Sequence, residues 1–71
     1  MRITNAQAKR IGDKLNVNWN KIDLEQLRRG MQVEQEHSNV VGKSLIKLGK
    51  VAHAHLKENP KYYTILKKYN L

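Results

Sequence analysis

Apolar side chains recur every three or four residues along most of the chain, which is the spacing of amphipathic α-helices. No stretch alternates apolar and polar positions for long enough to indicate a β-strand. The pattern predicts four short helices: one at about residues 5–15, one after Asp23, one at about residues 44–57 and one after Pro60. The sequence therefore predicts an all-α fold, a compact bundle of four short helices, with residues 1–71 forming a single domain.

Local signals mark several of the helix ends. Thr4 followed by Gln7 is a capping box, and Ile3 can pack against Ala8 across this first turn. Residues 38–42 are expected to form a loop. The residues expected to face the core are Ala8, Ile11, Leu15, Leu24, Leu27, Met31, Leu45, Leu48, Ala52, Leu56, Tyr62, Ile65, Leu66 and Tyr69.

The sequence also leads to packing predictions for three further residues. The lone tryptophan, Trp19, is expected to close the junction between helices as part of the core, because a small domain needs its largest apolar side chain inside. Gly30 lies within the second helical stripe, which indicates either a bend or the close approach of another backbone. Gly49 is small enough to allow close contact between helices.

The chain is at the size where one core contributes only a few kcal/mol of net stability. It has no cysteine, so no disulfide can add to that stability, and a location inside the cell or within a virus particle is the simplest expectation. The first residues contain no apolar signal-peptide region, and no run of about 18 apolar residues occurs. We therefore expect no export signal and no membrane span.

Basic residues dominate the second half of the chain. Residues 43–71 contain seven lysines and one glutamate, a net charge of +6, whereas residues 1–42 contain seven basic and five acidic residues, a net charge of +2. A lysine-rich face is expected to contact either the phosphate backbone of nucleic acid or an acidic protein surface, and its alternative is a well-solvated helical surface. This face consists of Lys43, Lys47, Lys50, Lys57, Lys61, Lys67 and Lys68.

Aromatic residues accompany the lysines of the C-terminal segment, as in proteins that bind nucleic acid by stacking and by phosphate contacts. Helical spacing predicts that Tyr62 and Tyr69 face the core and that Tyr63 alone is free. Binding would then be mainly electrostatic and independent of base sequence.

Two motifs of metal-capable side chains lie about twenty residues apart, and each has i, i+3 spacing. Glu34 and His37 occur in VEQEH, and His55 and Glu58 occur in HAHLKE. If the two helices pack antiparallel, the reversed order of the motifs brings two imidazoles and two carboxylates together. We expect Glu34, His55 and Glu58 to be close and largely buried, with His37 at their margin.

Two interpretations of this cluster remain open. Zinc or iron accepts both histidine nitrogen and carboxylate oxygen, so the four side chains could ligate one ion. Alternatively, the carboxylates accept hydrogen bonds from a histidine, from Lys50 or from a tyrosine hydroxyl, and this network fixes the helix register without any cofactor. A homo-oligomer could supply further metal ligands. Glu36 could act as a general base beside His37 but is better explained as a solvated charge, and we expect no enzymatic activity.

The chain resembles a family of small bacterial and phage proteins that is classed as a domain of unknown function. The segments AKRIGDKL, NW, DLEQLRRGMQVEQEH and GKVAHAHLKENPKYYTIL carry this resemblance over nearly the full length. It implies a small stand-alone helical domain, or a module appended to phage proteins, without assigned chemistry. Together with the absence of cysteine, it leads us to expect a location in the cytoplasm of a bacterium or phage-infected host, or within a virus particle. Family members are typically more acidic and often have a longer loop where this chain has SNVVGKS, so the basic surface is a property of this protein.

These observations favour a small non-enzymatic binding or structural module that contacts its partner through the lysine face. A metal-binding helical domain, with catalysis as a further option, is the alternative.

Overall fold

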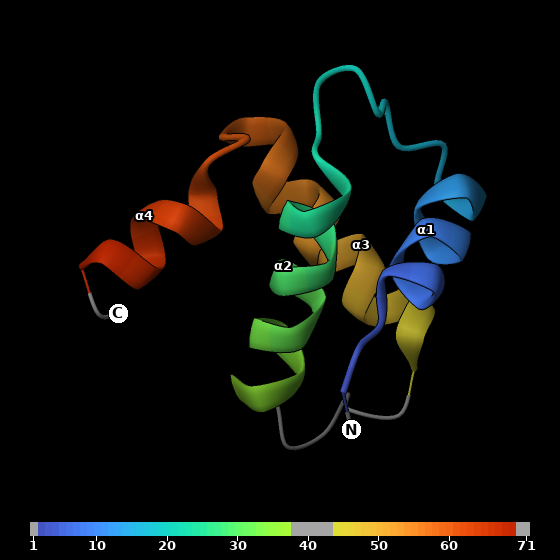
Figure 1. Cartoon of the computed structure of the whole chain (residues 1–71), viewed down its shortest axis with the longest axis horizontal. Coiled ribbons are helices and arrows are strands. Elements are labelled where there is room, and N and C mark those ends of the chain that lie inside the picture. Colours follow the sequence, from blue (N-terminus) through green and yellow to red (C-terminus); the bar gives the residue numbers. More distant parts are fainter. Residues whose placement is uncertain (1, 38–43, 70–71) are drawn as a thin grey trace.

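The computed structural model describes residues 2–37 and 44–69, and these form four helices without a strand (Figure 1). They are α1 (Asn5–Lys14), α2 (Leu24–His37), α3 (Leu45–Glu58) and α4 (Tyr62–Lys68). The predicted all-α bundle of four short helices is confirmed. The expected loop at residues 38–42 lies outside the described residues.

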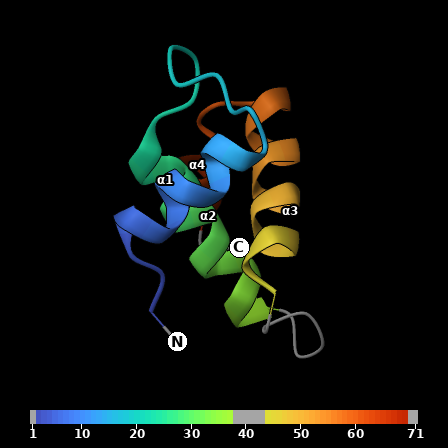
Figure 2. The ribbon, with the colours of Figure 1, turned by 90° about the vertical axis from the view of Figure 1, so that its right-hand side faces the viewer.

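Helices α1, α2 and α3 surround the core, and α4 extends to the side of α2 that lies away from α1 (Figures 1 and 2). α2 contacts each of the other three helices. None of the four described helices has the length and apolar character needed to cross a membrane.

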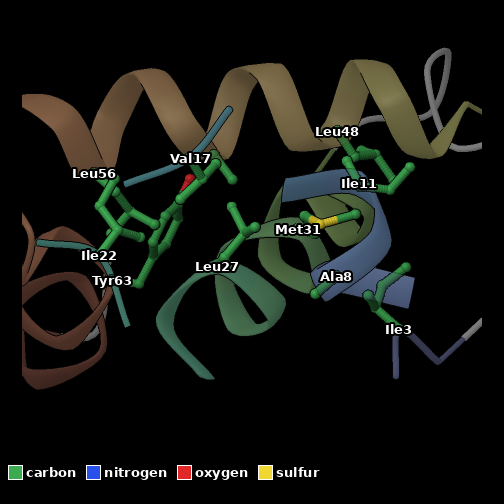
Figure 3. Close-up of a cluster of buried hydrophobic side chains, with 11 residues drawn as sticks. Ile3, Ala8, Ile11, Val17, Ile22, Leu27, Met31, Leu48, Leu56 and Tyr63 are labelled. Atoms are coloured by element: carbon green, nitrogen blue, oxygen red, sulfur yellow. The ribbon is translucent and has the colours of Figure 1, made fainter. Parts of the chain in front are cut away.

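One apolar cluster fills the space between the helices. Figure 3 shows Leu56, Ile22 and Tyr63 at one end of this cluster and Ile3 and Ala8 at the other, with α3 lying along it. The buried members are Ile3, Ala8, Ile11, Val17, Ile22, Leu27, Met31, Leu48, Ala52, Leu56 and Tyr63. The inward stripes predicted for the first three helices are thus largely confirmed, with Leu15, Leu24 and Leu45 partly buried at the edge of the core.

The start of α1 has the predicted capping box. Gln7 N–H donates to the Thr4 hydroxyl at 3.1 Å, and Thr4 N–H donates to the Gln7 side-chain oxygen at 2.9 Å. Two N–H groups that the first turn leaves without a helical partner are thereby satisfied. Ile3, just before the cap, is fully buried, as the sequence predicted for its packing against the first turn.

Asn16 ends α1 in the left-handed backbone region, with φ of 59°. Asn16 N–H donates to the Asp13 carbonyl and Val17 N–H donates to the Gly12 carbonyl, which together form a Schellman motif. Asparagine tolerates this conformation better than other residues with a side chain, and glycine tolerates it best.

We expect Asn16→Gly to leave the free energy of unfolding unchanged or to raise it by a few tenths of a kcal/mol. Asn16→Ala should lower it by about 1 kcal/mol, because a Cβ without a polar group is disfavoured at positive φ. Thermal unfolding followed by circular dichroism should then show a midpoint several degrees lower for the alanine variant. Equal midpoints for the two variants would contradict the left-handed assignment of Asn16.

Two close contacts join α1 to its neighbours. Gly49 of α3 faces Ile11 and Leu15, and a Cβ at Gly49 would lie 2.4 Å from Ile11 Cγ2, so the predicted close helix contact is confirmed. Trp19 packs its ring on Gly12 of α1 and donates from Nε1 to the Asp13 carboxylate at 2.9 Å. The tryptophan is only partly buried, but it closes the junction after α1 as predicted.

The helix predicted after Pro60 is short in the structure. Asn59 caps the C-terminal end of α3, and Pro60 lies in the turn that follows, so α4 begins only at Tyr62. α4 has seven residues, which is fewer than two full turns. This short helix is held by the contacts of its aromatic side chains.

Candidate functional site

A carboxylate, a phenol and an imidazole meet where α2, α3 and α4 come together. The Tyr63 hydroxyl of α4 donates a hydrogen bond of 2.8 Å to Glu34 Oε2 of α2. His55 Nε2 of α3 lies 3.8 Å from the same oxygen. We name Glu34, His55, Tyr62 and Tyr63 the polar cluster, because all four side chains contribute to this junction.

Aromatic packing fixes the rest of the polar cluster. The rings of His55 and Tyr62 are stacked, with centroids 4.4 Å apart and an interplanar angle of 5°. Tyr62 and Tyr63 meet edge to face at 4.9 Å. Such arrangements are favourable beyond the apolar area that they bury. The cluster therefore joins three helices through both hydrogen bonding and ring contacts.

Tyr63 has its ring seated on Gly30. A Cβ at Gly30 would lie 2.4 Å from Tyr63 Cε2, so only glycine allows the ring to approach the helix this closely. The approach predicted for Gly30 is thus made by an aromatic ring and not by another backbone. Burial of Tyr63, together with the negative charge and hydrogen bond of Glu34, raises the pKa of the phenol and keeps it a donor at neutral pH.

The predicted roles of the tyrosines are reversed in the structure. Tyr63 is 1% exposed, whereas Tyr69 is 63% exposed and Ile65 is 40% exposed. The prediction that Tyr62 and Tyr69 face the core and that Tyr63 is free is therefore wrong for Tyr63 and Tyr69. The inward position predicted for Ile65 is wrong as well. α4 presents the side carrying Tyr62, Tyr63 and Leu66 to the rest of the protein.

Glu34 and His55 are brought together as predicted, but they are not largely buried. Their side chains are 24% and 35% exposed, respectively. Glu58 is exposed, which corrects the prediction that it belongs to the buried cluster. It follows the buried Leu56 by two residues, which is a rotation of about 200° around the helix axis, so it points away from the core.

The other members of the predicted metal site are not part of the described cluster. His37 is the last residue of α2, and its side chain lies outside what the structure describes. Glu36 is exposed and accepts from the Gln32 amide at 3.4 Å. Among residues 2–36 and 44–69, no three histidine, cysteine or acidic side chains gather as a metal site would require. Glu34 and His55 can offer two ligands, and Tyr63 already donates to the carboxylate.

The described lysines of α3, of α4 and of the N-cap of α4 are exposed. We name as the lysine surface the six that the structure describes: Lys47, Lys50, Lys57, Lys61, Lys67 and Lys68. None of them forms an ion pair with another described residue. The ion pairs of basic side chains instead involve Lys9 with Asp13, and Arg28 and Arg29 with Glu25. Lys43 lies outside the described residues.

The lysines of α3 follow one side of the helix. Lys47, Lys50 and Lys57 share a stripe with the exposed Ala54, and the stripe is about 15 Å long at the rise of an α-helix. Lys68 of α4 lies over the ring of Tyr69, with Nζ 5.8 Å from the ring centroid. Positive charge and an exposed aromatic ring thus occur together on α4.

The fold and these contacts define a small all-α domain whose short C-terminal helix is attached through a polar cluster. Residues 8–70 match the model of the family described as "Protein of unknown function (DUF5661)", so the chain belongs to this family. The resemblance to a domain-of-unknown-function family is thereby confirmed. No curated protein and no solved structure matches the chain.

Proposed function

We propose that this chain is a non-enzymatic helical binding module whose lysine surface contacts the phosphate backbone of a nucleic acid. The observation that supports the proposal is the exposure of six lysines on α3 and α4 without carboxylate partners among the described residues. Unpaired cations keep their full attraction for an external anion, because no internal ion pair has to be broken first.

The chemistry of the cations favours phosphates over base edges. Residues 43–71 contain no arginine, so the lysine surface lacks the planar fork that reads guanine in the major groove. Lysine binds phosphate as a point charge, and its flexible stem adapts to backbone positions. Binding of this kind is independent of base sequence and sensitive to salt.

The polar cluster gives the lysine surface a fixed shape. The Tyr63 to Glu34 hydrogen bond and the His55 to Tyr62 stack attach α4 to α2 and α3. The lysines of α4 are therefore held in a constant position relative to the stripe on α3. A fixed array of charges loses less conformational freedom on binding than a flexible one. Tyr69, exposed beside Lys68, adds a ring on which a base can stack.

A titration of labelled duplex DNA and of single-stranded RNA at about 50 and 200 mM salt tests this proposal. We expect binding at the lower salt, with little dependence on sequence. For duplex DNA, log K should fall with log salt at a slope of about −0.9 for each neutralised phosphate. The double variant Lys47→Gln and Lys50→Gln should reduce the slope by about 1.8 if both lysines contact phosphates.

The matched control removes two charges from another helix. Arg10→Gln with Lys14→Gln changes the net charge equally, and both residues are exposed on α1 outside the lysine surface. We expect this control to keep the slope of the unmodified protein. Equal losses in both double variants would show that only net charge matters. Absence of binding at the lower salt overturns the nucleic-acid proposal, and salt-sensitive binding of polyglutamate in its place would identify an acidic protein surface as the partner class.

The cellular location of this module is also proposed from the resemblance to bacterial and phage proteins. The module would act in the cytoplasm of a bacterium or phage-infected host, or inside a virus particle.

A further inference from the structure

At one end of the molecule, the connection between α1 and α2 passes the C-terminal end of α3 (Figures 1 and 2). Residues of these segments line a hollow. It encloses about 560 Å³, which is within the range of small-molecule binding sites in proteins. Its walls come from residues 15–22, from the last turns of α3 and from Pro60. The polar cluster does not contribute to it, and of the lysine stripe on α3 only Lys57 does.

The polar part of the lining is basic. Lys21 enters from the α1 to α2 connection, and His53 and Lys57 enter from neighbouring turns of α3. No acidic residue is among the described residues that line the hollow. Partial burial and the adjacent Lys57 charge lower the pKa of His53, which indicates an environment that lacks a compensating anion. We name this space the basic hollow.

The remaining lining combines apolar and amide groups. The apolar lining that a ligand can reach comes from Leu15, which is half-buried, and Pro60, which is exposed. Beneath them Ile22 and Leu56 are almost fully buried and complete an apolar floor. Asn16 and Asn18 add side-chain amides, which offer both hydrogen-bond donors and acceptors. A ligand that fits this lining has an anionic group, an apolar face and polar edges.

We propose that the basic hollow binds a nucleoside phosphate. Lys21 and Lys57 hold the phosphate, the flat face of the base lies against the apolar floor and Pro60, and the asparagine amides contact the polar edge of the base. This inference goes beyond the proposed function, because it concerns a pocket for one nucleotide unit. It shares Lys57 with the lysine surface, adds Lys21 from outside that surface and does not require Lys47 or Lys50. The nucleotide unit can be free or part of a single strand, and the test separates these sources.

The test follows the His53 side-chain signals by NMR in the full chain, with His53→Gln used to assign them. The probes are adenosine monophosphate, adenosine and inorganic phosphate. We expect saturable changes at His53 with the monophosphate, at lower concentration than with either part alone, because the hollow contacts both the base and the phosphate. The pKa of His53 should rise on binding, since the phosphate charge offsets that of Lys57.

Two variants locate the phosphate. Lys21→Gln and Lys57→Gln should each weaken monophosphate binding by about tenfold, as expected for the loss of one charge-assisted hydrogen bond. Both lysines are exposed, so these changes should leave the fold intact. Arg10→Gln is the control, because it removes one charge from α1 and does not line the hollow. An equal loss with Arg10→Gln overturns the assignment, as does equal binding of inorganic phosphate and the monophosphate.

A short single-stranded oligonucleotide distinguishes the source of the ligand. A His53 response to the monophosphate identifies a free nucleotide as sufficient. A response to the oligonucleotide alone identifies a nucleotide unit within a strand. No His53 response to either probe overturns the inference, whereas duplex binding through the lysine surface could still be observed and would leave the proposed function standing.

Discussion

Tyr63→Ala is expected to lower the free energy of unfolding by about 3–5 kcal/mol, the usual loss when a large buried aromatic side chain is truncated. Tyr63 is 1% exposed and belongs to the apolar core, so its removal leaves a cavity between α2 and α4. A domain of 71 residues has a total stability of roughly 4–10 kcal/mol. The substitution should therefore remove a large part of the stability of the whole fold.

Urea unfolding followed by circular dichroism and by Trp19 fluorescence measures this loss. Tyr69→Ala is the matched control, because it removes the same side chain from the C-cap of the same helix, at a position that is 63% exposed. We expect the control to change the free energy of unfolding by less than about 0.5 kcal/mol. Similar losses for the two variants would show that α4 is not attached through Tyr63.

Tyr63→Phe separates the hydroxyl from the ring. It keeps the packing on Gly30 but removes the hydrogen bond to Glu34, for which we expect a loss of about 1–2 kcal/mol. The loss is smaller than that of the alanine variant because the ring stays in the core. It is further limited because the Glu34 side chain is 24% exposed and can be hydrated once its partner is gone. The ring, more than the hydroxyl, thus accounts for the stabilising effect of Tyr63.

The features that could be predicted from the sequence are those decided within one or two helical turns. Thr4 and Gln7 form their capping box because both partners lie in the same turn, and the structure confirms it. The stripes of α2 and α3 were also predictable, since 14-residue helices repeat their apolar period often enough to define one side. The proximity of Glu34 to His55 followed from extending those stripes.

The features that could not be predicted depend on contacts between distant segments. α4 is shorter than two turns, so its apolar spacing is compatible with more than one buried side. Gly30, which lies in another helix, decides that Tyr63 is the buried ring. For Glu58, the i, i+3 relation to His55 was correct, but the helix turns that position away from the core. Spacing within one motif does not determine which neighbour it meets.

The same distinction between predictable and unpredictable features applies to the basic side chains. The exposure of the α3 lysines follows from amphipathic spacing and was predicted. The gathering of Lys21 with His53 and Lys57 was not, because Lys21 lies in an irregular connection whose path depends on the turns at Asn16 and Trp19. A pocket formed by such a connection has no periodic signal in the sequence.

Gly30→Ala is expected to have opposite effects on stability in the presence and absence of the Tyr63 ring. In the unmodified protein, the new Cβ would lie 2.4 Å from Tyr63 Cε2 and 2.9 Å from Tyr63 Cδ2, so the ring has to move. The Glu34 hydrogen bond and the core packing oppose that movement. Overpacking of this kind costs about 1–3 kcal/mol. It offsets the gain of about 1 kcal/mol that alanine brings to a helix interior relative to glycine.

In the Tyr63→Ala background the ring is gone, and only the helix-propensity gain remains. Gly30→Ala should then raise the free energy of unfolding by about 1 kcal/mol. Urea unfolding of the two single variants and the double variant gives the coupling energy between the two positions, which we expect to be about 1–3 kcal/mol, the size of the overpacking cost. Additive effects would mean that the ring moves aside without loss. The same result would show that the packing of the Tyr63 ring on Gly30 does not hold α4 in place.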